Sequence, residues 1–341
     1  MIRMMDGVDL GFADECEPWR LESRLFPSKV GGKPAWLSLE KLPTTEELQC
    51  DTCKQQMIFL CQVYAPYEDD DSNFHRTLFV FVCSNASCCK NNQSDNIKVF
   101  RSHLRLRNKF YSERPPVEQP DPNFTLSQWV KLCNLCGCLA EKHCSKCKTA
   151  AYCCRDHQVL DWKEDHKQNC GTNNLKKVNS KKLFCEYELA IEPEIKSTHE
   201  IDEEKALEEY EQLKEEGKAG TMADVPEADL EAHSAVDEDK TFSQFRKQIN
   251  DDPDQVLRYE RGGNPLWIAK EPKPILIPDC EYCGGPRQFE FQIMPQMLTM
   301  LGENELDWGI LIVYSCKSSC VNIDGYKKEF VFKQDVSSKK N

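Results

Sequence analysis

The stretch Gly31-Gly32-Lys33-Pro34-Ala35-Trp36 returns 231 positions later as Gly262-Gly263-Asn264-Pro265-Leu266-Trp267. Other landmarks recur at offsets between 229 and 233. They are Cys50 and Cys280, Cys53 and Cys283, Gln62 and Gln292, Pro66 and Pro295, Cys83 and Cys316, and Cys88 and Cys320. An internal repeat of this kind indicates a repeated structural unit. It predicts one module that occurs twice, with other sequence inserted between the copies.

Cysteine content indicates the cellular environment. The chain has 341 residues, which allows two or three domains, and 20 of them are cysteines. Residues 1–20 contain several carboxylates and no apolar core, so they do not read as a signal peptide. No apolar run reaches the roughly 18 residues that a membrane-spanning helix requires. We therefore expect reduced, metal-binding cysteines in a protein of the cytosol or the nucleus, without membrane association.

The acidity of the chain is concentrated in one segment. Between Glu186 and Lys240 there are 20 acidic and 5 basic residues, a local net charge of −15. Since the whole chain carries −13, the remainder is near neutral at +2. A highly charged segment with few aromatic residues does not bury enough apolar surface to fold. We expect an acidic, flexible linker here.

The strongest motif lies between the two copies, where eight cysteine and histidine residues are closely spaced. Cys153 and His157 are four residues apart, as are His166 and Cys170, so each pair shares one helical face. His157 and His166 are nine apart, which at about 100° per residue places them on opposite faces. One helix therefore serves two tetrahedral zinc ions. The two predicted ligand sets are Cys133, Cys136, Cys153 and His157, and Cys144, Cys147, His166 and Cys170.

Each repeat copy carries its own set of four cysteines. A close pair precedes the predicted strands, and a second pair follows an apolar strand, as in the two knuckles of a zinc ribbon. The predicted sets are Cys50, Cys53, Cys83 and Cys88, and Cys280, Cys283, Cys316 and Cys320. A redox dithiol is the alternative for a single C-x-x-C, and Cys89 is an alternative to Cys88.

The repeated Gly-Gly-x-Pro-x-Trp element has no metal chemistry. Paired glycines permit a tight turn, proline stiffens it, and tryptophan fills a core. We predict a turn packed on its own sheet; a turn that grips a ligand is the alternative.

Several motifs point to a family. The central unit resembles a MYND zinc finger, including Tyr152-Cys153 and Asp161-Trp162, although most such fingers carry cysteine where His157 stands. With its flanks, the chain resembles the programmed cell death protein 2 family. The matching stretches are Phe26-Pro27-Ser28-Lys29-Val30-Gly31-Gly32, His75-Arg76-Thr77-Leu78-Phe79-Val80-Phe81-Val82-Cys83, Cys280-Glu281-Tyr282-Cys283-Gly284-Gly285-Pro286-Arg287 and Asp307-Trp308-Gly309-Ile310-Leu311.

The repeat, the cysteine sets and the resemblance together predict an α+β fold of small β-rich, zinc-stabilised modules. We expect the duplicated N- and C-terminal halves to pack together, with the MYND-type finger as an appendage and an acidic flexible linker. Zn²⁺ is the expected cofactor, with two ions in the finger and one in each flanking module. The predicted divisions are 1–113 (N-terminal repeat module with a ribbon-like zinc site), 114–132 (proline-rich linker), 133–170 (finger), 171–240 (acidic linker) and 241–341 (C-terminal repeat module with a ribbon-like zinc site).

The resemblance also implies a function. Its members are adaptors or chaperones that escort a newly made small-subunit ribosomal protein into ribosome assembly, and they are linked to cell proliferation, stem-cell maintenance and apoptosis. The alternative is a nuclear transcriptional adaptor whose finger recruits corepressor peptides. Direct nucleic-acid binding through the basic stretch 98–114 is disfavoured by the net acidity. We predict no enzymatic activity, because no catalytic motif competes with the metal motifs.

Overall fold

A computed structural model describes residues 7–172, 183–195, 240–302, 305–321 and 325–336. Ten strands close into one barrel in the order β1-β8-β2-β3-β4-β5-β12-β11-β10-β9, and all described pairs of neighbouring strands are antiparallel. The strands are β1 (Asp9–Asp14), β2 (Lys29–Val30), β3 (Ile58–Tyr64), β4 (His75–Val82), β5 (Ile97–Leu104), β8 (Tyr187–Pro193), β9 (Leu257–Tyr259), β10 (Arg287–Ile293), β11 (Ile310–Cys316) and β12 (Lys327–Gln334).

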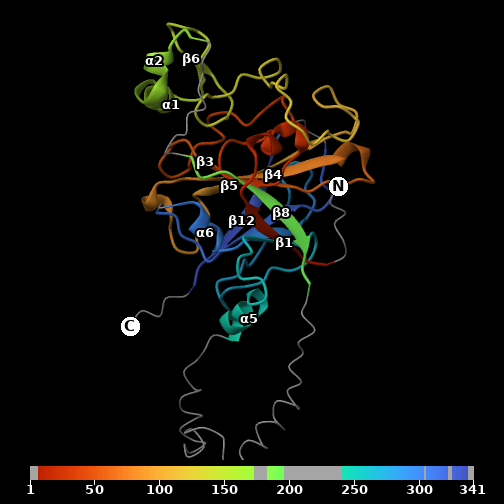
Figure 1. The fold of residues 1–341 in the computed structure, drawn as a ribbon. Helices are drawn as coiled ribbons and strands as arrows, with labels where there is room; N and C mark the ends of the chain where they lie inside the picture. The colour runs from red at the N-terminus through yellow and green to blue at the C-terminus, as the bar shows by residue number, and fades with distance from the viewer. Residues whose placement is uncertain (1–6, 173–182, 196–239, 303–304, 322–324, 337–341) are drawn as a thin grey trace, which may run out of the picture.

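The finger and a helix lie at opposite ends of the barrel (Figure 1). The finger contains β6 (Lys142–His143), β7 (Ala151–Tyr152), α1 (Arg155–Asp161), a π-helical stretch (Trp162–His166) and α2 (Lys167–Asn169). At the other end lies α5 (Lys240–Ile249), and the short α6 (Met297–Met300) follows β10. None of the helices in the described ranges is long and apolar enough to cross a membrane.

Both faces of the central strands are buried, which explains their nearly continuous apolar sequence. In β4, Leu78, Val80 and Val82 point into the barrel, and Phe79 and Phe81 point outward. The outward rings do not meet water, because loops and the finger cover them in a second core. A third core lies outside the C-terminal strands, under α5. The predicted β-rich character is therefore confirmed.

The two halves of the chain share this barrel instead of forming two separate modules that pack together. β5 of the N-terminal half pairs with β12 of the C-terminal half, and β1 pairs with β9. Complete strand pairing satisfies backbone groups that two separate small sheets would leave unpaired at their edges. The expectation of two packed modules is corrected to one continuous sheet.

Part of the predicted acidic linker is folded. β8 lies within the range 171–240 and pairs with β1 and β2, so it closes the barrel. Leu189 of this strand is buried inside, whereas Glu188 faces outward and accepts hydrogen bonds from Arg20 at 2.8 and 2.9 Å. Because apolar and polar residues alternate along β8, the strand has an apolar face although its composition is acidic. Residues 173–182 and 196–239 lie outside the described residues, and for them the linker remains a prediction.

β3 and β10 share two local features, a register shift and a glutamine that binds the repeated turn. Each strand has a register shift, between Phe59 and Cys61 in one and between Phe289 and Phe291 in the other. One residue further on in each strand, a glutamine binds the backbone of the residue before the repeated tryptophan. Gln62 Oε1 accepts from Ala35 N at 2.9 Å, and Gln292 Oε1 accepts from Leu266 N at 2.7 Å. The glutamine thus fixes each Gly-Gly-x-Pro-x-Trp turn to its sheet.

A buried charge network joins the halves inside the barrel. Arg76 of β4 forms a two-pronged pair with Glu290 of β10, at 2.8 and 2.9 Å, and both side chains are fully buried. Glu290 also accepts from Tyr259 at 2.6 Å and from Arg261 at 3.1 Å. Burial opposes ionisation of Glu290, but Arg76 and Arg261 outweigh it and hold the pKa of this carboxyl well below its usual range. The network therefore stays charged inside the fold.

Candidate metal centres

The structure brings together the four members of every predicted ligand set. Within each set, the sulfur and nitrogen atoms that would bind metal all lie within 4.8 Å of one another. The sets are Cys50, Cys53, Cys83 and Cys88; Cys133, Cys136, Cys153 and His157; Cys144, Cys147, His166 and Cys170; and Cys280, Cys283, Cys316 and Cys320. This spacing suits one tetrahedral ion per cluster, with ligands 2.0–2.3 Å from the metal.

The first cysteine pair of each cluster lies in the same kind of turn. In each turn the residue four positions after the first cysteine has a positive φ and donates its N–H to that cysteine's carbonyl. The pairs are Lys54 to Cys50 (3.0 Å), Gly137 to Cys133 (2.9 Å), Lys148 to Cys144 (2.9 Å) and Gly284 to Cys280 (2.8 Å). The turn thus holds both sulfurs of each C-x-x-C on one side.

Backbone amides in these turns favour the thiolate form of several ligands. Burial raises the pKa of the Cys50 thiol, but the N–H groups of Cys53 and Thr52, together with the thiols of Cys83 and Cys53, outweigh burial and lower it to about 7. Burial also opposes ionisation of Cys147, and the N–H of Ala150 is the main group that lowers its pKa, to about 5. Because zinc binds the thiolate, these amides prepare the turns for a metal ion.

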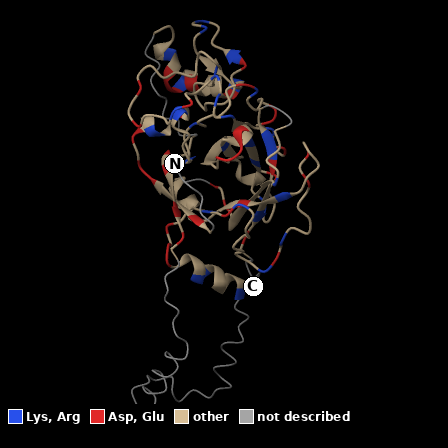
Figure 2. Ribbon diagram, turned by 90° about the vertical axis from the view of Figure 1, so that its right-hand side faces the viewer, with Lys and Arg blue, Asp and Glu red and all other residues tan. Residues whose placement is uncertain are grey.

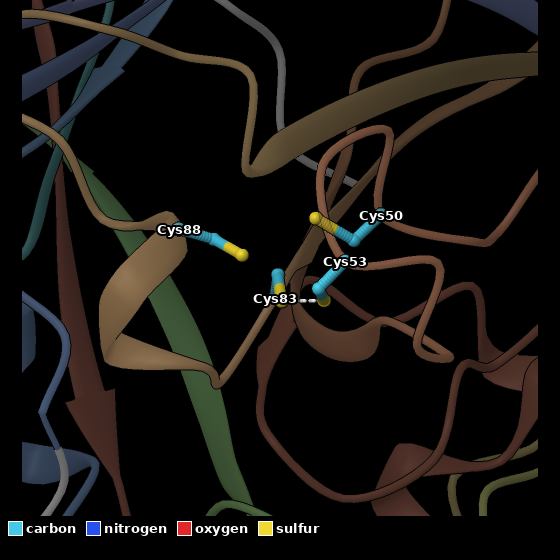
Figure 3. A group of neighbouring side chains, drawn as sticks. All are labelled: Cys50, Cys53, Cys83 and Cys88. Carbon is cyan, nitrogen blue, oxygen red and sulfur yellow. Dashed lines mark hydrogen bonds between the residues drawn. The ribbon is translucent and has the colours of Figure 1, made fainter.

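The N-terminal cluster contains Cys88 and not Cys89 (Figure 3). Cys83 directly follows β4, and its Sγ lies 3.5 Å from that of Cys53. A short 3-10 turn, Ala86–Cys88, directs the Cys88 side chain toward the other three. Cys89 instead lies next to the Asp307 carbonyl and the Lys333 ammonium, at 3.2 and 3.5 Å. The geometry favours Cys88 as the fourth ligand.

The C-terminal cluster is tied to a second buried ion pair that joins the two halves, between Glu329 and Arg101. Cys316 Sγ lies 3.6 Å from Cys283 Sγ, and the Cys316 N–H donates to Glu329 at 3.1 Å. Glu329 also pairs with Arg101 of β5 at 2.7 Å and with Arg287 at 3.0 Å. A carboxylate from the C-terminal half therefore connects this cluster to the N-terminal strands. Sequence spacing gave no signal for that connection.

The finger contains two interleaved clusters on one helical segment. In the first, His157 Nδ1 lies 3.1 Å from Cys153 Sγ. In the second, His166 Nε2 lies 3.5 Å from Cys147 Sγ. Cys154, which the predicted ligand sets leave out, caps α1 by accepting the N–H of His157 at 3.5 Å.

The finger is docked on the N-terminal half and is not a free appendage. The Trp36 indole N–H donates to the Gly137 carbonyl at 2.7 Å, and both groups are buried. Thr45 Oγ1 donates to the Cys153 carbonyl at 3.2 Å, and Lys33 Nζ donates to the Asn134 carbonyl. The repeated turn thus both fills the core and holds the finger. The appendage prediction was wrong because cysteine spacing carries no information about what covers a sheet.

Replacing Gly137 with alanine is expected to loosen this contact. Its φ is +73°, and an added Cβ would lie 2.8 Å from Lys33 Cβ. The strain alone costs about 1–2 kcal/mol, and the clash adds to it. Gly171→Ala is the matched control, because Gly171 has φ +90° with nothing within 4 Å of the new atom. Hydrogen exchange of the finger amides should rise in the Gly137 variant well beyond the control. Equal exchange in both variants would contradict the docking.

Comparison with known proteins agrees with this architecture. Residues 7–118 match the family model for the programmed cell death protein 2 N-terminal domain, 133–170 match the MYND finger, and 239–335 match the C-terminal putative domain of the same family. No solved structure matches the chain.

Several relatives share its sequence. Programmed cell death protein 2 of Mus musculus is 42% identical over 348 residues, covering 97% of each chain. Programmed cell death protein 2-like of Homo sapiens is 27% identical, covering 86% of this chain and 85% of its own. A Schizosaccharomyces pombe protein named "Probable 20S rRNA accumulation protein 4" is 34% identical over 110 residues, 27% of this chain and 28% of that protein. The coverage by the family models and by the mouse relative shows that the chain belongs to the programmed cell death protein 2 family.

Proposed function

We propose that this protein is a zinc-binding, non-enzymatic adaptor that chaperones a newly made small-subunit ribosomal protein and thereby supports ribosome biogenesis. The similarity to the fission yeast relative, whose name refers to 20S rRNA accumulation, carries this proposal. We place the protein in the cytoplasm and nucleus, with downstream effects on cell proliferation, stem-cell maintenance and apoptosis.

Zinc in this proposal is structural. Each cluster offers four protein ligands, and closed four-ligand sites are typical of structural zinc, whereas catalytic zinc keeps one position open. Two ions belong to the finger and one to each flanking half. Four sulfurs held by matching turns in both halves favour zinc over a redox dithiol.

The two halves, in our proposal, arose by duplication. The matching register shifts of β3 and β10, the glutamine bridges of Gln62 and Gln292, and the cysteine turns support it. We propose the same domain boundaries, at residues 113, 132 and 170. The proposed linker now consists of the residues on either side of β8, 173–182 and 196–239. An acidic linker would reduce premature contact of a basic client with RNA.

The structure gives little support for direct RNA binding by the stretch 98–114. Most of its cations already have carboxylate partners, so few are available to neutralise phosphates. The pairs are Lys98–Asp51 (2.8 Å), Arg101–Glu329 (2.7 Å), Arg105–Asp71 (3.8 Å), Arg107–Glu113 (2.7 Å) and Lys109–Glu40. A protein client is therefore the better candidate.

A groove on the finger supports the second candidate function, corepressor recruitment. It encloses about 580 Å³ and includes Trp162 and the exposed Val159. Basic residues line it, namely Lys142, Lys146, Arg155 and Lys163, and basic positions are visible on the finger at the top of Figure 2. A groove that offers an aromatic ring and an exposed valine suits an extended, proline-rich peptide.

Selective profiling of ribosomes bound to the tagged full chain tests the proposal. The messenger RNA of one small-subunit ribosomal protein should be enriched at least roughly tenfold, since capture of a nascent chain brings its ribosome along. Trp162→Ala should remove corepressor binding and leave this enrichment unchanged. It is a cleaner change than Cys133→Ser, which also disturbs the contact with the N-terminal half. Absence of any such enrichment would refute the chaperone function.

A variant with a shortened linker tests whether the acidic segment contacts the client or serves only as a tether. Residues 196–239 are replaced by a shorter glycine-serine chain, which spares β8. Undiminished client capture would leave the segment as a tether only.

A further inference from the structure

The two Gly-Gly-x-Pro-x-Trp turns share an unusual feature, a carboxylate beneath the second glycine. A Cβ added at Gly32 would collide with the Glu186 carboxylate, and one added at Gly263 would collide with the Glu260 carboxylate. The second position of each turn must therefore be glycine, because a larger residue there would displace the carboxylate. The surroundings of the two anions differ.

The carboxylate in the N-terminal half is neutralised within the chain. Lys29, almost fully buried, pairs with Glu186. The finger then covers the turn through Lys33 and Trp36, as described above. This turn has no remaining unsatisfied charge or indole donor.

The carboxylate in the C-terminal half, Glu260, forms no ion pair with any described residue. Within the described residues, the Glu260 side chain accepts only the Asn264 N–H, at 3.3 Å. The nearby Arg258 is already committed to Glu194 at 2.7 Å and to Gln255 at 2.8 Å. Glu260 thus carries an uncompensated charge in a half-buried position.

A pocket opens at this same turn. It encloses about 270 Å³, and its lining includes Glu194, Arg258, Glu260, Asn264 and Leu266. Two carboxylates against one guanidinium give the lining a net charge of −1. A pocket of this size and sign accepts a single lysine or arginine side chain.

Trp267 belongs to the same turn but does not line the pocket, and its indole N–H lacks the carbonyl acceptor that Trp36 has. Trp267 is only partly buried: it packs against Phe332 at 6.3 Å between ring centroids, and the Lys273 ammonium lies over its ring, 5.1 Å from the centroid. Among the described residues, none accepts a hydrogen bond from its indole N–H. Ile275 and Leu276, in the loop that follows, are exposed at 104% and 79%. In the N-terminal half the corresponding indole N–H donates to a backbone carbonyl of the finger.

We propose that this face of the C-terminal half binds a basic segment of the client. A lysine or arginine of the client pairs with Glu260 in the pocket, and a client carbonyl accepts the Trp267 N–H, as the finger carbonyl does at Trp36. Apolar client side chains cover Trp267 and Phe332. The identity of the partner rests on the proposed function; the chemistry of the face does not.

Glu260→Gln and Trp267→Leu in the full chain test this surface. Glutamine keeps the acceptor for Asn264 and removes only the charge, so folding should be preserved, which unchanged zinc content and melting temperature verify. Loss of one partly desolvated charge pair should weaken client capture by roughly tenfold. Glu46→Gln, which removes an exposed charge from the N-terminal half, is the matched control and should capture normally.

A photo-crosslinking residue in place of Asn264 identifies what occupies the pocket. The expected crosslink joins a lysine- or arginine-containing peptide of the captured ribosomal protein, and Glu260→Gln diminishes it. Normal capture by both variants would overturn the surface while leaving the chaperone function intact. Conversely, a Glu260-dependent crosslink to another basic protein, without any ribosomal client, would support the surface and refute the chaperone function. A crosslink to a second copy of this chain would also overturn the inference.

Discussion

Substituting Cys316 by serine is expected to lower the zinc content from four ions per chain to three and to destabilise the fold by more than about 5 kcal/mol. Structural zinc supplies roughly 10–16 kcal/mol of binding free energy, and most of it is lost with a thiolate ligand. Cys316 is fully buried at the end of β11, and its N–H binds Glu329, the carboxylate that also holds Arg101. Loss of the metal is therefore expected to weaken the Glu329–Arg101 pair that joins the two halves.

Elemental analysis and urea unfolding measure the two effects. Cys185→Ser is the control, because Cys185 is exposed and belongs to no cluster. It should retain four ions and the parental unfolding midpoint. A Cys316 variant with full zinc content would show that this thiol is not a ligand.

Substituting Glu290 by glutamine is expected to cost about 3–5 kcal/mol of unfolding free energy, the usual effect of breaking a buried ion pair by removing one partner. Glutamine preserves shape but leaves Arg76 fully buried without its counter-charge. The matched control is Glu113→Gln, which breaks the exposed pair with Arg107 and should cost less than about 1 kcal/mol. Chemical denaturation of the purified variants measures both values, and similar costs for the two would contradict the role of burial.

The same carboxyl gives a pH dependence with a defined sign. Because the folded pKa of Glu290 lies below its unfolded value, its contribution is complete above the unfolded pKa of about 4.3. It is lost progressively as the pH falls below that value. The stability difference between the parent and the Glu290→Gln variant should therefore shrink under acid and stay constant from pH 6 to 8. A difference that grew with acidity would refute the assignment.

The sequence predicted local features far better than long-range ones. Cysteine spacing and helical phase were enough to sort eight finger residues into two sets, because ligand grouping depends on positions a few residues apart. Cysteine spacing did not decide between Cys88 and Cys89 as the fourth ligand. Adjacent residues differ in the direction of their side chains, and this direction is set by the turn Ala86–Cys88. β8 was missed because alternation over seven residues is weak beside a strongly acidic composition.

Contacts across the chain had no sequence signal. The repeat correctly suggested that two similar units belong together, but not that β5 and β12 join in one sheet. Nor did it show that the Trp36 indole N–H binds the finger whereas the Trp267 indole N–H donates to no described residue. Identical motifs acquire different roles from what packs on them, and packing partners come from distant parts of the chain.

Strand order has a consequence for synthesis. Among the described strands, β1 (residues 9–14) is synthesised first, yet its two neighbours in the barrel are β8 and β9, which end at Pro193 and Tyr259. At roughly 5–20 residues per second, the first strand stays unpaired for on the order of 10–50 seconds. The barrel therefore closes late, after β9 has emerged, and until then the backbone groups of β1 lack their strand partners.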